Sequence, residues 1–152
     1  MDILPFSHSF AHRATLPVIE LSEKLISIAP KSMGKVYLVN SGSEAVDTAM
    51  KMVWYYHNAI GKPEKKKIIS RLRAYHGVTI AAGSLTALAY AQDGWDLPID
   101  RILHCDTPCY YRYGENGESE EEFATRLADN LDKQIQAEGP ETVGAFIAEP
   151  LM

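Results

Sequence analysis

The chain has 152 residues, of which 46% are hydrophobic and 23% are charged, and its formal net charge is −5. This length buries a substantial core and favours one domain, and the composition is that of an ordinary globular protein. The negative charge argues against a nucleic-acid partner, and the lysine run at residues 65–67 is interpreted as the solvated entry to a strand. No apolar run approaches the ~20 residues that a membrane helix needs. The N-terminus lacks the basic and then apolar segments of a signal peptide, so we expect a cytoplasmic protein.

The residues that could bind a metal do not form a recognised pattern. Cys105 and Cys109 are not at a standard zinc spacing, and we expect two free thiols. His8 and His12 are close enough in sequence to share a metal, but no third ligand accompanies them. We therefore expect no metal site.

The apolar pattern predicts strands and helices in alternation. Pro17 suits the first turn of a helix and Pro30 stops it, while Ser119 and Glu122 form a capping-box pattern that begins a later helix. Gly139 ends that later helix. In chain order we expect a helix over 16–29, a strand over 35–40, a helix over 43–60, a strand over 66–73, a helix over 78–91, a strand over 101–105, a polar connection over 107–118, a helix over 119–138 and a strand over 143–148.

Strands that alternate with helices imply a parallel sheet joined by right-handed crossovers, so the expected fold class is α/β. In such sheets, ligands bind beyond the carboxyl ends of the strands. Three segments follow predicted strands and fall at that edge: Ser41-Gly42-Ser43, Tyr75-His76 and Glu149. We expect these segments to form one site.

The turn Ser41-Gly42-Ser43 stands between a predicted strand and the start of a helix. The amides of Ser43, Glu44 and Ala45 would lack partners within the helix, so they could bind a phosphate. Gly42 would allow a close approach of the backbone or a φ angle closed to other residues. The alternative is a simple helix cap, with Ser41 as the N-cap and Glu44 reaching back. The turn matches neither a Walker A loop nor a dinucleotide-binding fingerprint.

The other two segments carry groups suited to a flat ring. Tyr75 at a strand end can stack on such a ring, and His76 beside it can form a hydrogen bond at the ring's edge. The alternative for this pair is an aromatic plug over the edge of the sheet. Glu149 places a carboxylate at the same edge, where Pro150 fixes the exit of the chain. A solvated acidic residue after a strand is the alternative there.

These motifs together carry a family resemblance. Residues 40–45 (NSGSEA), 73–77 (RAYHG) and 146–150 (FIAEP), in this order and at these separations, resemble the class III (omega) aminotransferases, which are pyridoxal-phosphate enzymes of fold type I. The similarity extends over essentially the whole chain and is greatest to the omega-amino acid:pyruvate branch. It implies that residues 1–152 are an incomplete, three-layer α/β segment of the large, cofactor-binding domain, without the small C-terminal domain.

The resemblance also implies roles for the site residues. The segment Ser41-Gly42-Ser43 would hold the phosphate of pyridoxal 5′-phosphate, through the backbone amides and hydroxyl of its last two residues. Tyr75 would stack on the pyridine ring, and His76 would lie near that ring in a supporting role. Glu149 would form a hydrogen bond near the ring oxygen of the cofactor, or order a neighbour that does.

The implied activity is transamination. The amino group of an amine or omega-amino acid would move to the cofactor and then to a keto acid such as pyruvate. The implied assembly is a homodimer or a tetramer of dimers, with the aromatic N-terminal residues 6–12 near the subunit interface. Neither a nucleic acid nor a membrane is implied as a partner.

The sequence departs from the family pattern in two ways. Val46 stands where the family usually has an asparagine, and we expect it to loosen the polar contacts of the first helical turn. The family's Schiff-base lysine and the aspartate that pairs with the pyridine nitrogen would lie beyond Met152, so we expect no catalytic residue in this segment and no activity from it alone. The alternative is a non-catalytic phosphate-ligand-binding module or a purely structural α/β fragment.

Overall fold

The computed structural model describes residues 13–151, and the chain divides into two compact units, Met1–Leu38 and Val39–Met152. The first unit contains helix α1, Leu16–Ile28, which has Pro17 in its first turn and ends before Pro30, as the sequence predicts. None of its residues is buried. The aromatic residues 6–12 lie outside the described residues, and the assignment of the chain to one partial domain stays a prediction.

The strand predicted over residues 35–40 is wrong. These residues form no regular element and pair with no strand in the described part of the chain, and Tyr37 is 66% exposed. An apolar run indicates a segment suited to burial, whereas a strand exists only where a neighbour supplies partners for its N–H and C=O groups.

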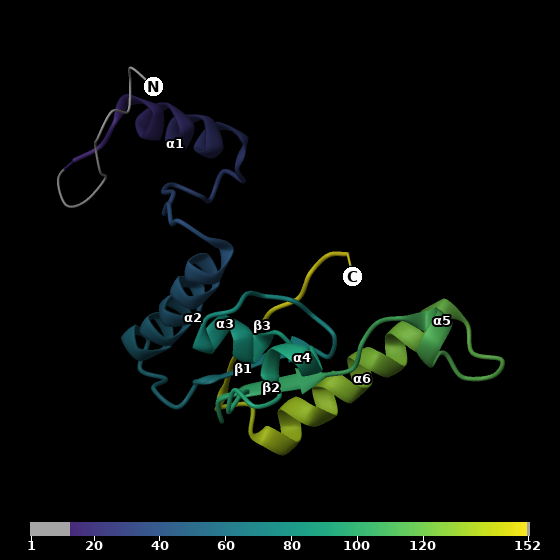
Figure 1. Ribbon diagram of the computed structural model, residues 1–152. Helices are drawn as coiled ribbons and strands as arrows, with labels where there is room; N and C mark the ends of the chain where they lie inside the picture. Colours follow the sequence, from purple (N-terminus) through teal and green to yellow (C-terminus); the bar gives the residue numbers. More distant parts are fainter. Residues whose placement is uncertain (1–12, 152) are drawn as a thin grey trace. The chain divides into compact units, whose positions relative to one another are not determined.

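The second unit contains a parallel sheet, as the alternation of strands and helices predicts (Figure 1). Its strands are β1, Lys67–Arg71; β2, Ile102–Cys105; and β3, Val143–Phe146. The order is β2-β1-β3, and both neighbouring pairs are parallel. The first strand in the sequence is therefore the central one.

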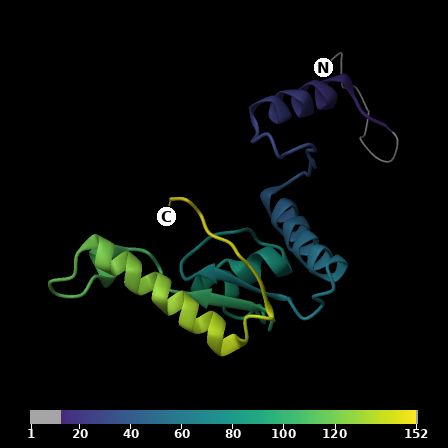
Figure 2. The ribbon, with the colours of Figure 1, turned by 180° about the vertical axis from the view of Figure 1, so that it is seen from behind.

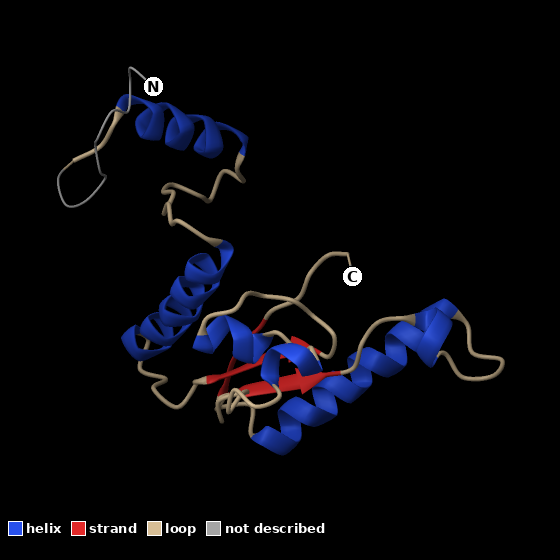
Figure 3. Cartoon of the chain, viewed as in Figure 1, coloured by secondary structure: helices blue, strands red, loops and turns tan. Residues whose placement is uncertain are grey.

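Helices cover both faces of this sheet, which gives the three layers that the sequence predicts (Figure 3). On one face, α2 (Gly42–Ala59) and α3 (Ile80–Leu85) pack over a core cluster. That cluster consists of Met50, Ile68, Leu85 and Ile102. The long helix α6, Glu120–Glu138, lies across the other face.

The single helix predicted over residues 78–91 is instead two short helices, α3 and α4 (Ala89–Gln92), because the chain breaks at Thr86. The Thr86 hydroxyl forms hydrogen bonds with residues 76 and 77, and Ala87 N donates to Ala74 O (3.0 Å). These bonds draw residues 86 and 87 out of the helical path. The predicted polar connection over 107–118 also contains a short helix, α5, Tyr110–Tyr113.

The predicted boundaries of α6 are confirmed. Glu122 N donates to Ser119 Oγ (3.2 Å), and Ser119 N donates to Glu122 Oε2 (2.8 Å), which completes the capping box. Gly139 follows the helix with φ +85°. No helix in residues 13–151 is both long and apolar enough to cross a membrane.

The lysine run at residues 65–67, which leads into β1, does more than face solvent. Lys65 Nζ donates to Pro140 O (2.7 Å), and Lys67 Nζ forms an ion pair with Glu138 (2.8 Å). These side chains therefore tie the start of β1 to the chain that leads from α6 into β3.

Candidate functional site

The segments that were predicted to share a site do meet in the second unit. The predicted turns line one cavity of about 460 Å³, formed by Ser41, Gly42, Ser43, Val46, Tyr75, His76 and Gly77. Glu149 does not line the cavity, but its Oε1 accepts a hydrogen bond from Tyr75 N (2.9 Å). Figure 2 shows the chain after β3 passing beside the loop that follows β1, where Arg71 Nη1 also donates to Glu149 O (2.9 Å).

Ser41 caps helix α2. Its Oγ accepts from Glu44 N (3.2 Å), and the Glu44 carboxylate reaches back to accept from Asn40 N (2.8 Å). Ala45 N donates to Ser41 O (3.1 Å). The helix-cap interpretation is thus confirmed, and the expectation of unpartnered amides at Glu44 and Ala45 is wrong. Among the described residues, Gly42 N and Ser43 N have no acceptor, so two amides remain for an anion.

The two glycines of the site have different roles. Gly42 does not have a positive φ, which rules out the second of the two predicted alternatives, an unusual φ angle. A Cβ there would meet nothing within 4 Å, which leaves its surroundings open to a ligand. Gly77 is the glycine that permits a close approach, with φ +132° and a built Cβ only 2.5 Å from Ser43 Oγ. The sequence motif contained Gly77 but gave no sign of this contact, because Ser43 lies far from it in the chain.

Side-chain oxygens hold the backbone of residues 75–78, which we call the 75–78 turn. Each amide of the turn donates to one of them: Tyr75 N to Glu149 Oε1 (2.9 Å), His76 N and Gly77 N to Thr86 Oγ1 (2.8 and 3.1 Å), and Val78 N to Ser43 Oγ (3.0 Å). Sequence reasoning missed Thr86, since a threonine inside an apolar helical pattern carries no signal of such a role.

Two polar atoms beside the cavity are buried without a hydrogen-bond partner among the described residues: His76 Nε2 and Glu149 Oε2. Burial lowers the pKa of His76 below its usual value of 6.5, and the Glu149 carboxylate offsets part of that effect. The imidazole is therefore neutral at neutral pH and can donate or accept a hydrogen bond. Unpaired buried polar atoms are rare, and these two belong to side chains that the sequence assigned to the site.

The departure at Val46 does not have the expected effect. Val46 packs against the core cluster, and the cap bonds of Ser41 and Glu44 are intact. The prediction that Val46 loosens the first turn of α2 is therefore wrong.

The cavity offers hydrogen-bond donors for an anionic group and an aromatic face for a flat ring. Gly42 N, Ser43 N and the Ser43 hydroxyl supply hydrogen-bond donors at a helix N-terminus, where an anion is favoured. The Tyr75 side chain is 52% exposed and offers a ring face for stacking. Within residues 13–151, no cluster of His, Cys, Asp or Glu could hold a metal, and His8 and His12 lie outside that range.

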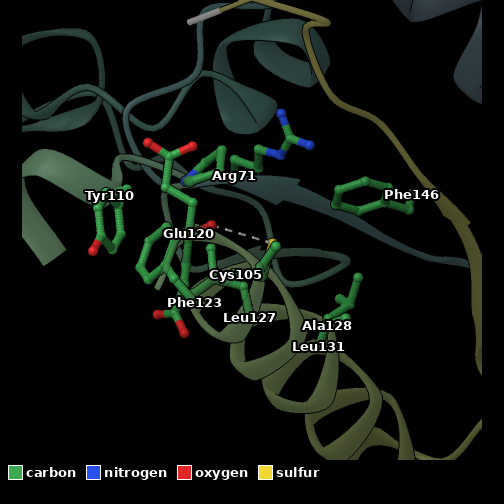
Figure 4. A pocket seen from close by; sticks show the side chains of 12 residues that line it. Arg71, Cys105, Tyr110, Glu120, Phe123, Leu127, Ala128, Leu131 and Phe146 are labelled. Carbon is green, nitrogen blue, oxygen red and sulfur yellow. Dashed lines mark hydrogen bonds between the residues drawn. The ribbon is translucent and has the colours of Figure 1, made fainter. Parts of the chain in front are cut away.

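A second cavity, of about 450 Å³, lies between the sheet and α6 and contains none of the predicted site residues (Figure 4). Phe123, Leu127 and Leu131 of α6 form its apolar wall, and the Arg71 guanidinium lies 5.7 Å from the centre of the Phe146 ring. Cys105 also lines it and is a free thiol, as is Cys109, in agreement with the sequence prediction.

Residues 5–152 match the family of class-III aminotransferases. With its parallel α/β sheet and a site assembled from the family's motifs, the chain belongs to this family.

Curated relatives over this length include plant gamma-aminobutyrate transaminases. The chain is 55% identical to the probable gamma-aminobutyrate transaminase 2, mitochondrial, of Oryza sativa subsp. indica, and 52% identical to the gamma aminobutyrate transaminase 1, mitochondrial, of Solanum lycopersicum. Both matches cover 100% of the chain but only 31% and 30% of the relatives. The chain thus spans less than a third of their length.

Solved structures agree with this assignment. The omega transaminase from Pseudomonas jessenii in complex with PMP matches with a TM-score of 0.94 and 58% identity, over 99% of this chain and 33% of that one. The PMP-bound aminotransferase from Vibrio fluvialis matches with a TM-score of 0.89 and 46% identity, over 96% and 32% of the two chains.

Proposed function

We propose that the chain is the part of an aminotransferase large domain that binds pyridoxal 5′-phosphate. The whole enzyme moves an amino group from an amine or omega-amino acid to a keto acid such as pyruvate. The observation that carries this proposal is the cavity that brings free helix N-terminal amides, a serine hydroxyl and an exposed tyrosine ring together. Family membership and the relatives that contain PMP, the aminated form of this cofactor, support it.

The 41–43 turn binds the phosphate in this proposal. Gly42 N and Ser43 N donate to phosphate oxygens, and the helix dipole of α2 favours the negative charge. Ser43 Oγ already accepts from Val78 N, which leaves its own proton free to donate to the phosphate. Ser41 acts indirectly, because its side chain is engaged in the helix cap.

The 75–78 turn presents the ring-binding groups. The Tyr75 ring stacks on the cofactor ring, and the neutral His76 imidazole lies beside it. Glu149 holds the Tyr75 amide with one carboxylate oxygen and keeps the other for a polar group at the ring's edge. The cofactor itself supplies the electron sink for the carbanion formed next to nitrogen.

The chemical step needs a lysine that the cavity does not contain. No lysine among the described residues lines it. We propose that the Schiff-base lysine and the aspartate for the pyridine nitrogen are supplied by another part of the protein, so the 152-residue chain alone does not transaminate. Transamination by a chain shown by mass to end at Met152 would overturn this proposal.

Titration with pyridoxal phosphate tests the site directly. We expect saturable binding that inorganic phosphate competes away, and a Ser43→Ala variant that binds about tenfold or more weakly, since it loses a hydrogen bond to a charged group. Ser119→Ala is the matched control, because it removes a serine at the N-terminus of another long helix. Absence of binding, or equal weakening by both variants, would leave the structural α/β interpretation. Binding of phosphate without the ring would favour a phosphate-binding module.

We also propose that the enzyme assembles as a homodimer, or as a tetramer of dimers, through a surface next to the site. A cavity of about 550 Å³ includes Gly77 of the 75–78 turn and is bordered by exposed Val78, Ile80, Tyr90 and Trp95. An apolar patch of this kind is typical of a protein interface. Light scattering should show a dimer that Ile80→Arg dissociates; a wild-type monomer would contradict the proposal.

The location of the protein also remains a proposal. The sequence favours the cytoplasm, whereas the names of the rice and tomato relatives include the word mitochondrial. Fractionation of cells that express the tagged protein from its own gene distinguishes the two compartments.

A further inference from the structure

We propose that Thr86 is a positioning residue for the cofactor site: its buried hydroxyl fixes the 75–78 turn and thereby orients Tyr75 and His76. The effect of Thr86 on cofactor binding rests on the proposed function. The structural part of the inference rests on the geometry of the turn alone.

The hydroxyl of Thr86 is fully used. The residue is 0% exposed, and its Oγ1 accepts from His76 N (2.8 Å) and Gly77 N (3.1 Å) while it donates to Gly77 O (2.9 Å). A hydroxyl has one proton and two lone pairs, so this arrangement satisfies it completely. It also supplies the acceptor that the turn lacks, since the amides of residues 76 and 77 donate to no backbone carbonyl among the described residues.

The backbone around Thr86 fixes the position of this hydroxyl. Thr86 directly follows the last residue of α3, and its N donates to Ala82 O within that helix (2.9 Å). The next residue pairs with the chain just before the turn: Arg73 N donates to Ala87 O (2.9 Å), and Ala87 N donates to Ala74 O (3.0 Å). Thr86 is therefore held between a helix end and the segment that enters the turn, so its oxygen is an anchor of defined position.

Replacement of the hydroxyl by a methyl group keeps the volume but removes all three bonds. In Thr86→Val, one buried amide, one partly buried amide and one carbonyl lose their partner, and the turn must move to find others. Such movement displaces Tyr75 and His76, which the turn carries, and also Val78, whose amide contacts the phosphate-binding Ser43. Thr86→Ser keeps the hydroxyl and is expected to keep the turn.

The experiment compares Thr86→Val, Thr86→Ser and Ser70→Ala in the complete protein. Ser70 is the matched control, because it is equally buried and its hydroxyl donates to the backbone carbonyl of Leu85 (2.8 Å), which precedes Thr86, and to no atom of the turn. Two quantities are measured: hydrogen exchange at the amides of residues 76 and 77 without cofactor, and the dissociation constant of pyridoxal phosphate well below each melting temperature. In Thr86→Val, the exchange rates of the two amides and the dissociation constant should each rise by about tenfold or more. A tenfold rise corresponds to a loss of about 1.4 kcal/mol of stabilisation.

The controls separate positioning from general stability. Thr86→Ser and Ser70→Ala should stay within about twofold of wild type in the dissociation constant, even where the melting temperature falls. Wild-type values in Thr86→Val, or an equal rise in Ser70→Ala, would overturn the proposal. If Thr86→Val does not fold, rapid exchange of both amides in the wild-type protein would overturn it equally. If the wild type binds no pyridoxal phosphate, the proposed function fails, while the exchange comparison still decides whether Thr86 holds the turn.

Discussion

Gly77→Ala tests the close approach between the two turns of the site. A Cβ at this position would lie 2.5 Å from Ser43 Oγ, 2.9 Å from Ala82 Cβ and 3.0 Å from Ser43 Cα. The last of these is a backbone atom that cannot rotate away. The φ of +132° is also one that L side chains rarely adopt.

The size of the effect follows from these two terms. An unfavourable positive φ costs about 1–2 kcal/mol, and an extra methyl group in a packed site costs about 1–3 kcal/mol. We therefore expect Gly77→Ala to lower the free energy of unfolding by about 2–5 kcal/mol, a large share of the ~5–15 kcal/mol typical of a domain. Because Ser43 must move to relieve the contact, affinity for pyridoxal phosphate should fall as well.

Urea unfolding, followed by tryptophan fluorescence, measures this change. Gly61→Ala is the matched control, since Gly61 also has a positive φ (+73°) but a Cβ there meets nothing within 4 Å. That control should lose only about 1–2 kcal/mol. If Gly77→Ala is no less stable than Gly61→Ala, the contact with Ser43 does not contribute to the loss of stability, which would refute its assigned role.

Three further predictions concern a helix cap and two titrating groups. Ser119→Ala should lower the free energy of unfolding by about 1 kcal/mol while Ser119→Asp preserves it, and urea unfolding that shows no difference between them would contradict the role of the cap. A hydrogen bond from Arg126 lowers the pKa of Glu118 from 4.5 to about 2, so this group stabilises the fold above pH 4.5 and its contribution is lost as the pH falls towards 2. Glu118→Gln should therefore lose less free energy of unfolding between pH 7 and pH 3 than the wild-type protein does. An equal loss in both proteins would contradict this role of Glu118. Burial lowers the pKa of His76, so the contribution of this group to the stability of the apo fold is fully present above pH 6.5 and is lost as the pH falls below this value. NMR titration of the ring should give a midpoint below 6.5, and one at or above 6.5 would refute the cause assigned here.

Sequence patterns predicted the elements that depend on local chemistry. The capping box at Ser119 and Glu122 and the proline near the start of α1 carry their signals within one turn of helix, so those boundaries were confirmed. The parallel sheet followed from the order of elements alone. The segment over 35–40 failed because a strand depends on a neighbour, which the local pattern does not contain.

The sequence predicted which segments form the candidate site, but it did not predict the hydrogen bonds and close contacts that join them. The 41–43 and 75–77 motifs were expected to meet, and they line one cavity. The break at Thr86 and the contact between Gly77 and Ser43 join residues from separate elements, so neither the chain pattern nor the spacing could reveal them. Similarly, the number of free amides at the start of α2 depended on the bonds that Glu44 N and Ala45 N donate to Ser41.

The side-chain oxygens that hold the 75–78 turn come from residues 43, 86 and 149, which span most of the second unit. During synthesis, β1 and β2 can pair as soon as residue 105 has emerged, but Glu149 reaches Tyr75 only after β3 has been made. The amides of the 75–78 turn donate to side-chain oxygens and to no backbone carbonyl among the described residues, so the turn reaches its final shape only when those side chains are in place. A nascent chain can therefore have β1 and β2 paired and still lack a site competent for its ligand.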